Sequence, residues 1–160
     1  MTFNHLDAQG KARMVDVGGK PVTSRRAVAS ARVHLTSETL AALIAGELAK
    51  GDALSTARIA GILGAKRTPD LIPLCHPLSL DHVHVEVEPD LEGGCVRITA
   101  EAATTARTGV EMEALTAAAV AGLAVIDMVK SRDRTAHLEH VRLELKEGGK
   151  SGRWERESGP

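Results

Sequence analysis

Residues 82–103, HVHVEVEPDLEGGCVRITAEAA, alternate apolar and polar side chains on both sides of a short turn. An alternation with a period of two places the apolar side chains on one face of a β-strand. The segment 89–94, which begins with proline and ends with two glycines, is suited to reversing the chain between the two runs. The stretch therefore predicts an antiparallel hairpin with strands over 82–88 and 95–103.

Two further alternating runs, at 27–35 and 140–146, predict a strand before the hairpin and another near the end of the chain. Between the first run and the hairpin, apolar residues recur at helical spacing over 37–50 and again over 53–66. Asp52 suits the N-cap of the second helix, because its carboxylate can accept hydrogen bonds from the free N–H groups of the first turn.

A third helix is expected to begin near Thr108 and to end at about residue 132. Thr108 and Glu111 match the S/T-x-x-E capping box. Apolar residues over 112–129 surround nearly the whole helix, so we expect it to be buried on all sides. One sheet face covers only one side of a helix, and the small residues over 117–124 would let another backbone approach closely. We therefore expect an obligate oligomer in which a partner subunit covers the rest.

In chain order these elements are β-α-(α)-β-β-α-β. They predict an α+β fold of the ferredoxin-like, split βαβ kind (βαββαβ), with an extra helix inserted after the first helix and an antiparallel four-stranded sheet. We expect one domain over residues 1–160. An irregular N-terminal arm is expected at 1–24 and a flexible C-terminal tail at 147–160.

The composition excludes several classes of protein. The chain has one Phe, one Trp and no Tyr, and its 20 basic residues are balanced by 21 acidic ones. Nucleic-acid-binding proteins usually carry aromatic stacking platforms and a basic excess, so we expect no nucleic-acid partner. The longest uncharged run, 114–126, is shorter than the ~20 residues that span a bilayer. We expect no membrane partner, and a cytoplasmic protein whose two cysteines are thiols.

Three groups of polar residues are candidates for chemistry. Lys50 and Asp52 flank a glycine between the first two helices, and the proline-rich segment 66–77 can hold Cys75 and His76 in place at little entropic cost. This segment could equally be a rigid connector with solvated charges.

The third group lies on the long helix. Asp127 and Lys130 are neighbours at i, i+3, and a lysine beside an aspartate has a pKa that its surroundings can tune for acid–base work. By spacing alone, a surface ion pair of little energetic value is an open alternative. Glu111 and Glu113 lie at the start of the same helix, and Glu113 is ~21 Å from Asp127 along the axis. Because this exceeds what one small ligand spans, a site that uses both ends would draw on two subunits.

On these residues the chain resembles the cyclic pyranopterin monophosphate synthase family, also called molybdenum cofactor biosynthesis protein C. The two most specific stretches are Leu71-Ile72-Pro73-Leu74-Cys75-His76-Pro77 and Thr108-Gly109-Val110-Glu111-Met112-Glu113-Ala114-Leu115-Thr116. Further matches, at consistent spacing along nearly the whole chain, are Met14-Val15-Asp16-Val17, Lys50-Gly51-Asp52, 56–62, 65–70, Asp127-Met128 with Lys130, and Gly148-Gly149-Lys150-Ser151-Gly152.

The resemblance implies a lyase that converts (8S)-3′,8-cyclo-7,8-dihydroguanosine 5′-triphosphate to cyclic pyranopterin monophosphate and releases pyrophosphate. It also implies a homohexamer, a trimer of dimers, with sites at subunit interfaces, and no cofactor. The implied catalytic residues are Asp127, Lys130 and Lys50. The implied substrate-binding residues are Leu74, Cys75, His76, Glu111, Met112 and Glu113, with Arg25, Lys66 and Lys146 as contacts for the anion.

Two other functions are open alternatives. A cyclohydrolase acting on GTP commonly uses a zinc-bound water, but His82 and His84 have no third ligand nearby and Cys75-His76 lacks a second pair, so we expect no metal. The other alternative is a ferredoxin-like regulatory or RNA-binding module, and the absence of aromatic residues on the hairpin strands weighs against RNA binding.

Overall fold

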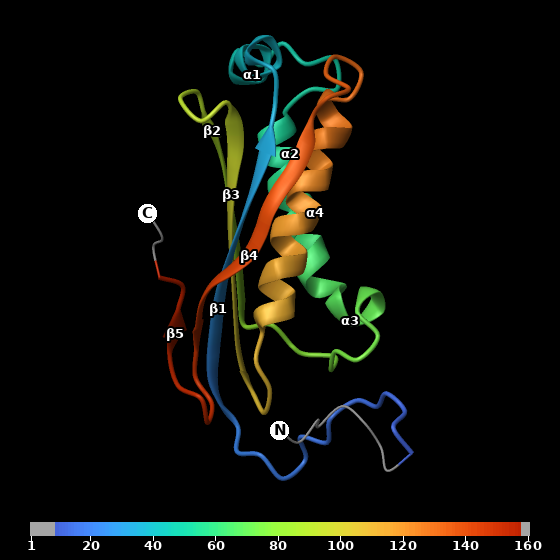
Figure 1. Ribbon diagram of the computed structural model, residues 1–160, viewed down its shortest axis with the longest axis vertical. Coiled ribbons are helices and arrows are strands. Elements are labelled where there is room, and N and C mark those ends of the chain that lie inside the picture. The colour runs from blue at the N-terminus through green and yellow to red at the C-terminus, as the bar shows by residue number, and fades with distance from the viewer. Residues whose placement is uncertain (1–8, 158–160) are drawn as a thin grey trace.

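The computed structural model describes residues 9–157 and shows one twisted sheet with helices on one of its faces (Figure 1). The strands are β1 (Thr23–His34), β2 (His82–Asp90), β3 (Cys95–Ala106), β4 (His137–Glu147) and β5 (Trp154–Glu155). The helices are α1 (Ser37–Ile44), α2 (Ala53–Lys66), α3 (Thr68–Leu71) and α4 (Glu111–Val129).

The sheet has the strand order β2-β3-β1-β4-β5, and all its neighbouring pairs are antiparallel. The order β2-β3-β1-β4 is that of a ferredoxin-like βαββαβ fold, so the predicted fold class is confirmed. The predicted hairpin is also confirmed, with the buried side chains of Val85 and Val87 opposite Ala100 and Ile98. The sheet gains a fifth strand because Trp154 and Glu155, in the segment expected to be a tail, pair with β4.

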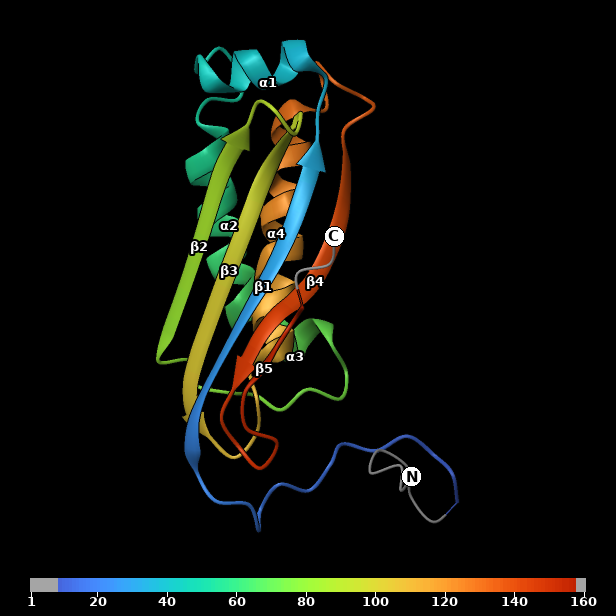
Figure 2. The same ribbon diagram turned by 60° about the vertical axis from the view of Figure 1, so that its left-hand side comes forward.

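Two helices, α2 and α4, cover the inner face of the sheet, and α1 lies across its end (Figure 2). The helices in addition to the βαββαβ set are therefore α1, which precedes α2 instead of following it as expected, and the one-turn α3. Helix α1 also ends at Ile44 rather than at 50. Gly46 adopts φ 72°, its N–H bonds to the Leu43 carbonyl, and the N–H of Glu47 bonds to the Ala42 carbonyl. This is the Schellman arrangement, which stops a helix wherever a glycine takes the left-handed position.

The capping box predicted at the start of α4 is not formed. The helix begins at Glu111, so the N-cap position falls on Val110, which makes no side-chain cap hydrogen bond. The Glu111 carboxylate instead lies against Gly109, where a Cβ atom would be 1.9 Å from one of its oxygens. Glu111 is thus free of the capping role that the sequence pattern had suggested.

The small residues of α4 pack closely against another helix, and that helix is α2 of the same chain. A Cβ atom on Gly61 would lie 3.0 Å from the Ala117 carbonyl and 3.1 Å from the Ala121 Cβ, and one on Gly64 would lie 2.9 Å from Val120. The glycines of α2 therefore set how closely the two helices pack. The expectation that these alanines await a partner subunit is wrong for this stretch of α4.

Part of α4 is nevertheless uncovered. Leu123 is 58% exposed, whereas Ala118 and Val125 are fully buried against the sheet and neighbouring helix. By length and composition alone, α4 is the one helix in residues 9–157 that could cross a membrane, and just over half of it is buried inside the domain. Its apolar character is accounted for largely by its place in the core.

Candidate functional site

Asp127, Lys50 and Lys130 form a compact cluster at the C-terminal end of α4. Lys50 Nζ lies 2.8 Å from one carboxylate oxygen of Asp127, and Lys130 Nζ lies 2.6 Å from the other. The two ammonium groups, that of Lys130 first, lower the pKa of Asp127 to about 2. The carboxylate is therefore ionised at any physiological pH, with a lysine on each side.

Local backbone structure holds this acid–lysine cluster in place. Lys50 precedes Gly51, which turns the chain with φ 89°, and Asp52 caps α2 by accepting from the Ser55 N–H at 3.0 Å, as predicted. Lys50 Nζ also donates to the main-chain carbonyl of Asp127 at 2.7 Å. That carbonyl belongs to the last turn of α4, where carbonyls lack partners within the helix and a cation is favourable.

A second cluster lies at the N-terminal end of α4. Glu113 is only 3% exposed, and burial, together with the charge of Glu111, raises its pKa. Cys75 faces the same carboxylate: burial and then the Glu113 charge raise the pKa of its thiol. Cys75 and Cys95 are both free thiols. A buried carboxyl with a raised pKa can exchange a proton nearer neutral pH than an ordinary glutamate.

His76 ties the N-terminal arm to this second cluster. Its Nε2 lies 2.8 Å from the Val15 carbonyl and can donate to it. Val15 and Val17 are partly covered, while Met14 between Arg13 and Val15 is exposed. The arm contact was not predicted, because a hydrogen bond to a main-chain carbonyl leaves no signal in the identity of Val15.

Cationic side chains gather near the same end of α4. The Arg25 guanidinium lies against Gly149 and donates to the Arg107 carbonyl at 3.4 Å, while its buried Nε has no hydrogen-bond partner in the described part of the chain. Lys146 Nζ is 3.7 Å from a Glu111 oxygen and donates to Ser151 Oγ. Lys66 is exposed in the last turn of α2. The structure thus adds Gly149 and Ser151, from the Gly148–Gly152 stretch, to the surroundings of Arg25 and Lys146.

Two apolar side chains complete this end. Met112 is 36% exposed and Leu74 is 37% exposed, so both present apolar surface to the outside of the protomer. Large exposed apolar side chains beside charged groups are typical of ligand or subunit contacts.

The candidate residues fall into two groups that one chain does not bring together. Asp127, Lys50 and Lys130 lie at the end of α4 near α1, and the other candidates lie at the opposite end, near α3 (Figure 1). Helix α4 is continuous between Glu113 and Asp127, which places these residues ~21 Å apart along the axis. Within the described part of the chain, no group of three or more His, Cys, Asp or Glu side chains is arranged to hold a metal.

The fold and the two clusters define a small α+β enzyme that presents acid–base groups and cations at both ends of one helix. The chain belongs to the MoaC family, whose sequence model matches residues 14–149. It is 59% identical over 150 residues to a cyclic pyranopterin monophosphate synthase of Roseiflexus castenholzii, covering 94% of this chain and 95% of the relative.

Two other relatives carry the same name. The protein of Geobacter sulfurreducens is 52% identical over 159 residues, covering 99% of both chains. That of Dinoroseobacter shibae is 54% identical over 155 residues, covering 97% of this chain and 98% of the relative. The similarity therefore spans essentially the whole chain.

Proposed function

We propose that this protein is a lyase that forms cyclic pyranopterin monophosphate from (8S)-3′,8-cyclo-7,8-dihydroguanosine 5′-triphosphate and releases pyrophosphate, in molybdenum cofactor biosynthesis. The names of relatives that are more than 50% identical along the whole chain support this proposal. The structural observation that carries it is the Asp127 carboxylate held between Lys50 and Lys130.

The acid–lysine cluster suits the proton transfers of this reaction. Opening the five-membered ring of the purine and closing a pterin ring both move protons, so groups that donate and accept them are required. An ammonium group can donate a proton and also stabilise the negative charge that develops on the leaving pyrophosphate. Asp127, ionised throughout, holds and orients the ammonium groups of both lysines.

The opposite end of α4 supplies the binding groups. A triphosphate carries about four negative charges, which Arg25, Lys66 and Lys146 offset. The buried Nε of Arg25 has no hydrogen-bond partner within residues 9–157, as expected of a group that meets an anion. The purine then lies beside the second cluster, where the polar side chains of Glu113 and His76 contact it. The rest of the surface that contacts the purine is formed by Leu74, Cys75, Glu111 and Met112.

The complete site lies between subunits of a homohexamer built as a trimer of dimers. Support comes from the distance between the two clusters and from the apolar side chains that the protomer leaves bare. Ile59 is 60% exposed and Leu63 is 55% exposed one helical turn later on α2, and Leu123 is similarly exposed on α4. In a two-fold pair, the Asp127 end of one α4 meets the Glu113 end of the other.

Mixed oligomers test this arrangement. Asp127→Asn and Glu113→Gln proteins are each expected to be inactive. When the two are unfolded together in equal amounts and refolded, half of the dimers combine one of each. In every such dimer one site holds both native residues, so about a quarter of wild-type turnover returns. Refolding each variant alone is the control, and a mixture with no more activity than the two separate proteins contradicts the shared site.

The substrate itself is tested by a second assay. The protein is incubated with the cyclised nucleotide and, separately, with GTP, and release of pyrophosphate is measured. Turnover of GTP, without turnover of the cyclised nucleotide, would show that the protein is a cyclohydrolase and not the proposed lyase. We further place the enzyme in the cytoplasm, a proposal that the free thiols Cys75 and Cys95 support.

A further inference from the structure

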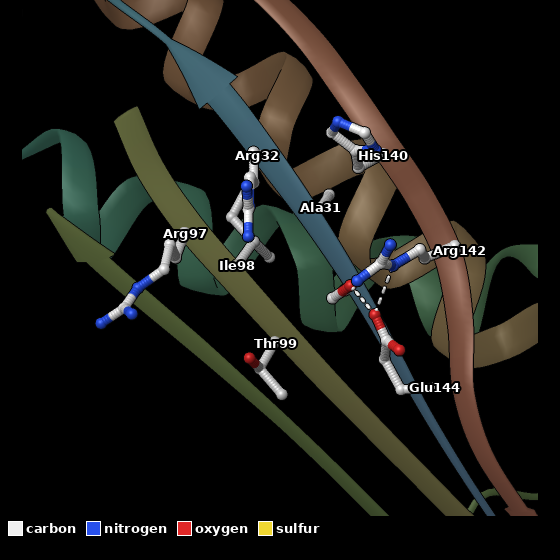
Figure 3. A pocket seen from close by; sticks show the side chains of 9 residues that line it. Ala31, Arg32, Arg97, Ile98, Thr99, His140, Arg142 and Glu144 are labelled. Atoms are coloured by element: carbon white, nitrogen blue, oxygen red, sulfur yellow. Dashed lines mark hydrogen bonds and ion pairs between the residues drawn. The ribbon is translucent and has the colours of Figure 1, made fainter. Parts of the chain in front are cut away.

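A hollow lies on the outer face of the sheet, on the side away from α2 and α4 (Figure 3). It measures about 190 Å³ and is lined by the polar side chains of β1, β3 and β4. Arg32, Arg97 and Arg142 surround it, with His140 at one side and a single carboxylate, Glu144, at the other. None of these residues belongs to the two clusters at the ends of α4.

Arg32 and Arg97 are directly opposite each other across the β1–β3 pair. Like charges in such a cross-strand pair repel each other and destabilise the sheet. Arg97 is partly compensated by Glu88 and Asp90, at 3.6 and 3.8 Å. The Arg32 side chain makes no ion pair or hydrogen bond with residues 9–157. One cation in the hollow is therefore left without an ion pair among the described residues, since Glu139, opposite it on β4, pairs with His34 and His140.

The only carboxylate in the hollow is already engaged. Glu144 accepts from Arg142 at 2.7 Å and from the Ser30 hydroxyl, and Arg156 lies 3.6 Å from its second oxygen. With these partners it cannot also neutralise Arg32. Figure 3 shows Arg142 and Glu144 on one side of Arg32 and the Arg97 side chain on the other.

The backbone of β4 is distorted at this place. Ser30 pairs with Arg142 and Arg32 pairs with Glu139, so Ala31 alone faces both His140 and Val141. This is a β-bulge, and His140 within it has φ 53°, the only positive φ of a non-glycine residue in the described chain. Bulges and strained residues of this kind recur beside binding sites, where they re-aim side chains. Here the bulge places His140 and Arg142 on the rim of the hollow.

We propose that this hollow binds a small phosphate-type anion, inorganic pyrophosphate or phosphate. Arg32 and Arg97 hold the anion, and Arg142 adds positive charge at the rim. Arginine is suited to this because its planar guanidinium donates two parallel hydrogen bonds to phosphate oxygens. The volume fits a small anion and is well below the 300–1,000 Å³ of sites that enclose a whole drug-sized ligand. The anion removes the Arg32–Arg97 repulsion, so binding and local stability are coupled.

Calorimetric titration of the intact protein with pyrophosphate, and separately with phosphate, at constant ionic strength tests the site. Wild type is expected to bind one anion per chain at the hollow, in addition to any at the catalytic site. Arg32→Gln and Arg97→Gln should each weaken the hollow's affinity by about tenfold or more, the loss of a hydrogen bond to a charged group. Arg32→Lys should keep part of it. Arg134→Gln, which removes an exposed arginine outside the hollow, is the matched control.

A second readout separates binding from a structural role. Without added anion, Arg32→Gln relieves a repulsion, so its Tm should equal or exceed that of wild type, and pyrophosphate should raise it less than it raises the wild-type Tm. Unchanged anion stoichiometry and affinity in both Arg32→Gln and Arg97→Gln would overturn the proposal. Adding GTP during the pyrophosphate titration then shows whether the phosphates of a nucleotide compete with the free anion for the hollow. None of these measurements depends on catalytic turnover.

Discussion

Lys50 and Asp127 are 77 residues apart in the sequence and are joined by two hydrogen bonds. Lys50 Nζ donates to the Asp127 carboxylate at 2.8 Å and to the Asp127 main-chain carbonyl at 2.7 Å. The same lysine thus fixes both the side chain of Asp127 and the end of the helix that carries it. Lys130 contacts the carboxylate alone and is 61% exposed, against 39% for Lys50.

Replacing either lysine should slow the reaction without unfolding the protein. We expect Lys50→Ala and Lys130→Ala each to lower kcat/KM by about 10²-fold or more, which is the usual contribution of a positioned proton donor. Turnover of the cyclised nucleotide is the measurement. Arg132→Gln is the control, because it breaks an exposed ion pair with Glu38 (2.9 Å) at the same end of the molecule. Near-normal turnover in both lysine variants would exclude the assigned roles.

Asp127 should stabilise the fold in a pH-dependent way. Its pKa is lowered from 3.8 to about 2 by Lys130 and Lys50, so its contribution is present above pH 3.8 and is lost as the pH falls through about 2. We expect the unfolding free energies of wild type and Asp127→Asn to differ at pH 5 and to converge towards pH 2, as followed by urea titration. A difference that stays constant over this range would show that the two lysines do not act on the carboxylate.

Glu113 should behave in the opposite sense. Burial raises the pKa of its carboxyl above 4.5, so whatever stability the protonated form provides is present below pH 4.5 and is lost as the pH rises through the raised value. Burial thus penalises the charged form of this carboxyl, and the protein is less stable above pH 4.5 than it would be with a neutral group there. We therefore expect Glu113→Gln to raise Tm at pH 7, with a gain that disappears below pH 4.5, while turnover falls.

Glu86→Gln, which changes an exposed glutamate on β2, should leave both Tm and turnover unchanged. If the Glu113→Gln protein were instead less stable than wild type at pH 7, the carboxylate would have to be stabilised by contacts other than those described above.

Two adjacent glycines should respond differently to alanine. A Cβ atom on Gly148 would lie 2.1 Å from the main-chain carbonyl of Ser24, whereas one on Gly149 would lie 1.8 Å from Nη1 of Arg25. A backbone carbonyl in a strand cannot move aside, but the end of an arginine side chain can. We expect Gly148→Ala to lower Tm markedly, and Gly149→Ala chiefly to displace Arg25 and raise KM.

Gly152→Ala isolates the cost of conformation in this comparison. Gly152 has a similar positive φ, 65°, with nothing within 4 Å of the added Cβ, so only the ~1–2 kcal/mol cost of a left-handed alanine applies. Thermal melts and initial rates of Gly148→Ala, Gly149→Ala and Gly152→Ala measure these effects on Tm and KM. Equal effects at Gly149 and Gly152 would show that Arg25 has no part in binding.

The fold was predictable from the sequence wherever periodicity was strong. The strict alternation over 82–88 and 95–103 identified a hairpin that the structure confirms. Strand β5 was missed because two residues are too few for a period, and Trp154 and Glu155 form a strand only by pairing with the distant β4. The end of α1 was misplaced because Gly46 and Gly51 both adopt a positive φ, and composition does not distinguish which of them stops the helix.

The site was predictable in part. The pairing of Asp127 with Lys130 follows from their i, i+3 spacing and is confirmed. The contact of Asp127 with Lys50 depends on how α2 packs on α4, which spacing does not reveal. Likewise, His76 was visible as a candidate, but its bond to the Val15 carbonyl arises from the path of the arm. The capping box failed because the helix starts two residues later than the motif requires, with its N-cap at Val110 instead of Thr108.

Helix α4 fixes the distance between the acid–lysine cluster at its C-terminal end and the second cluster at its N-terminal end. Its 19 residues form one continuous helix whose middle packs against the glycines of α2, so the gap between the acid–lysine cluster and the Glu113 carboxyl is set by the number of helical turns. Inserting a single residue near Ala119 would rotate one end by about 100° against the other. An insertion or deletion in α4 would therefore change both the spacing and the relative orientation of the groups at its two ends, whereas a substitution would preserve them.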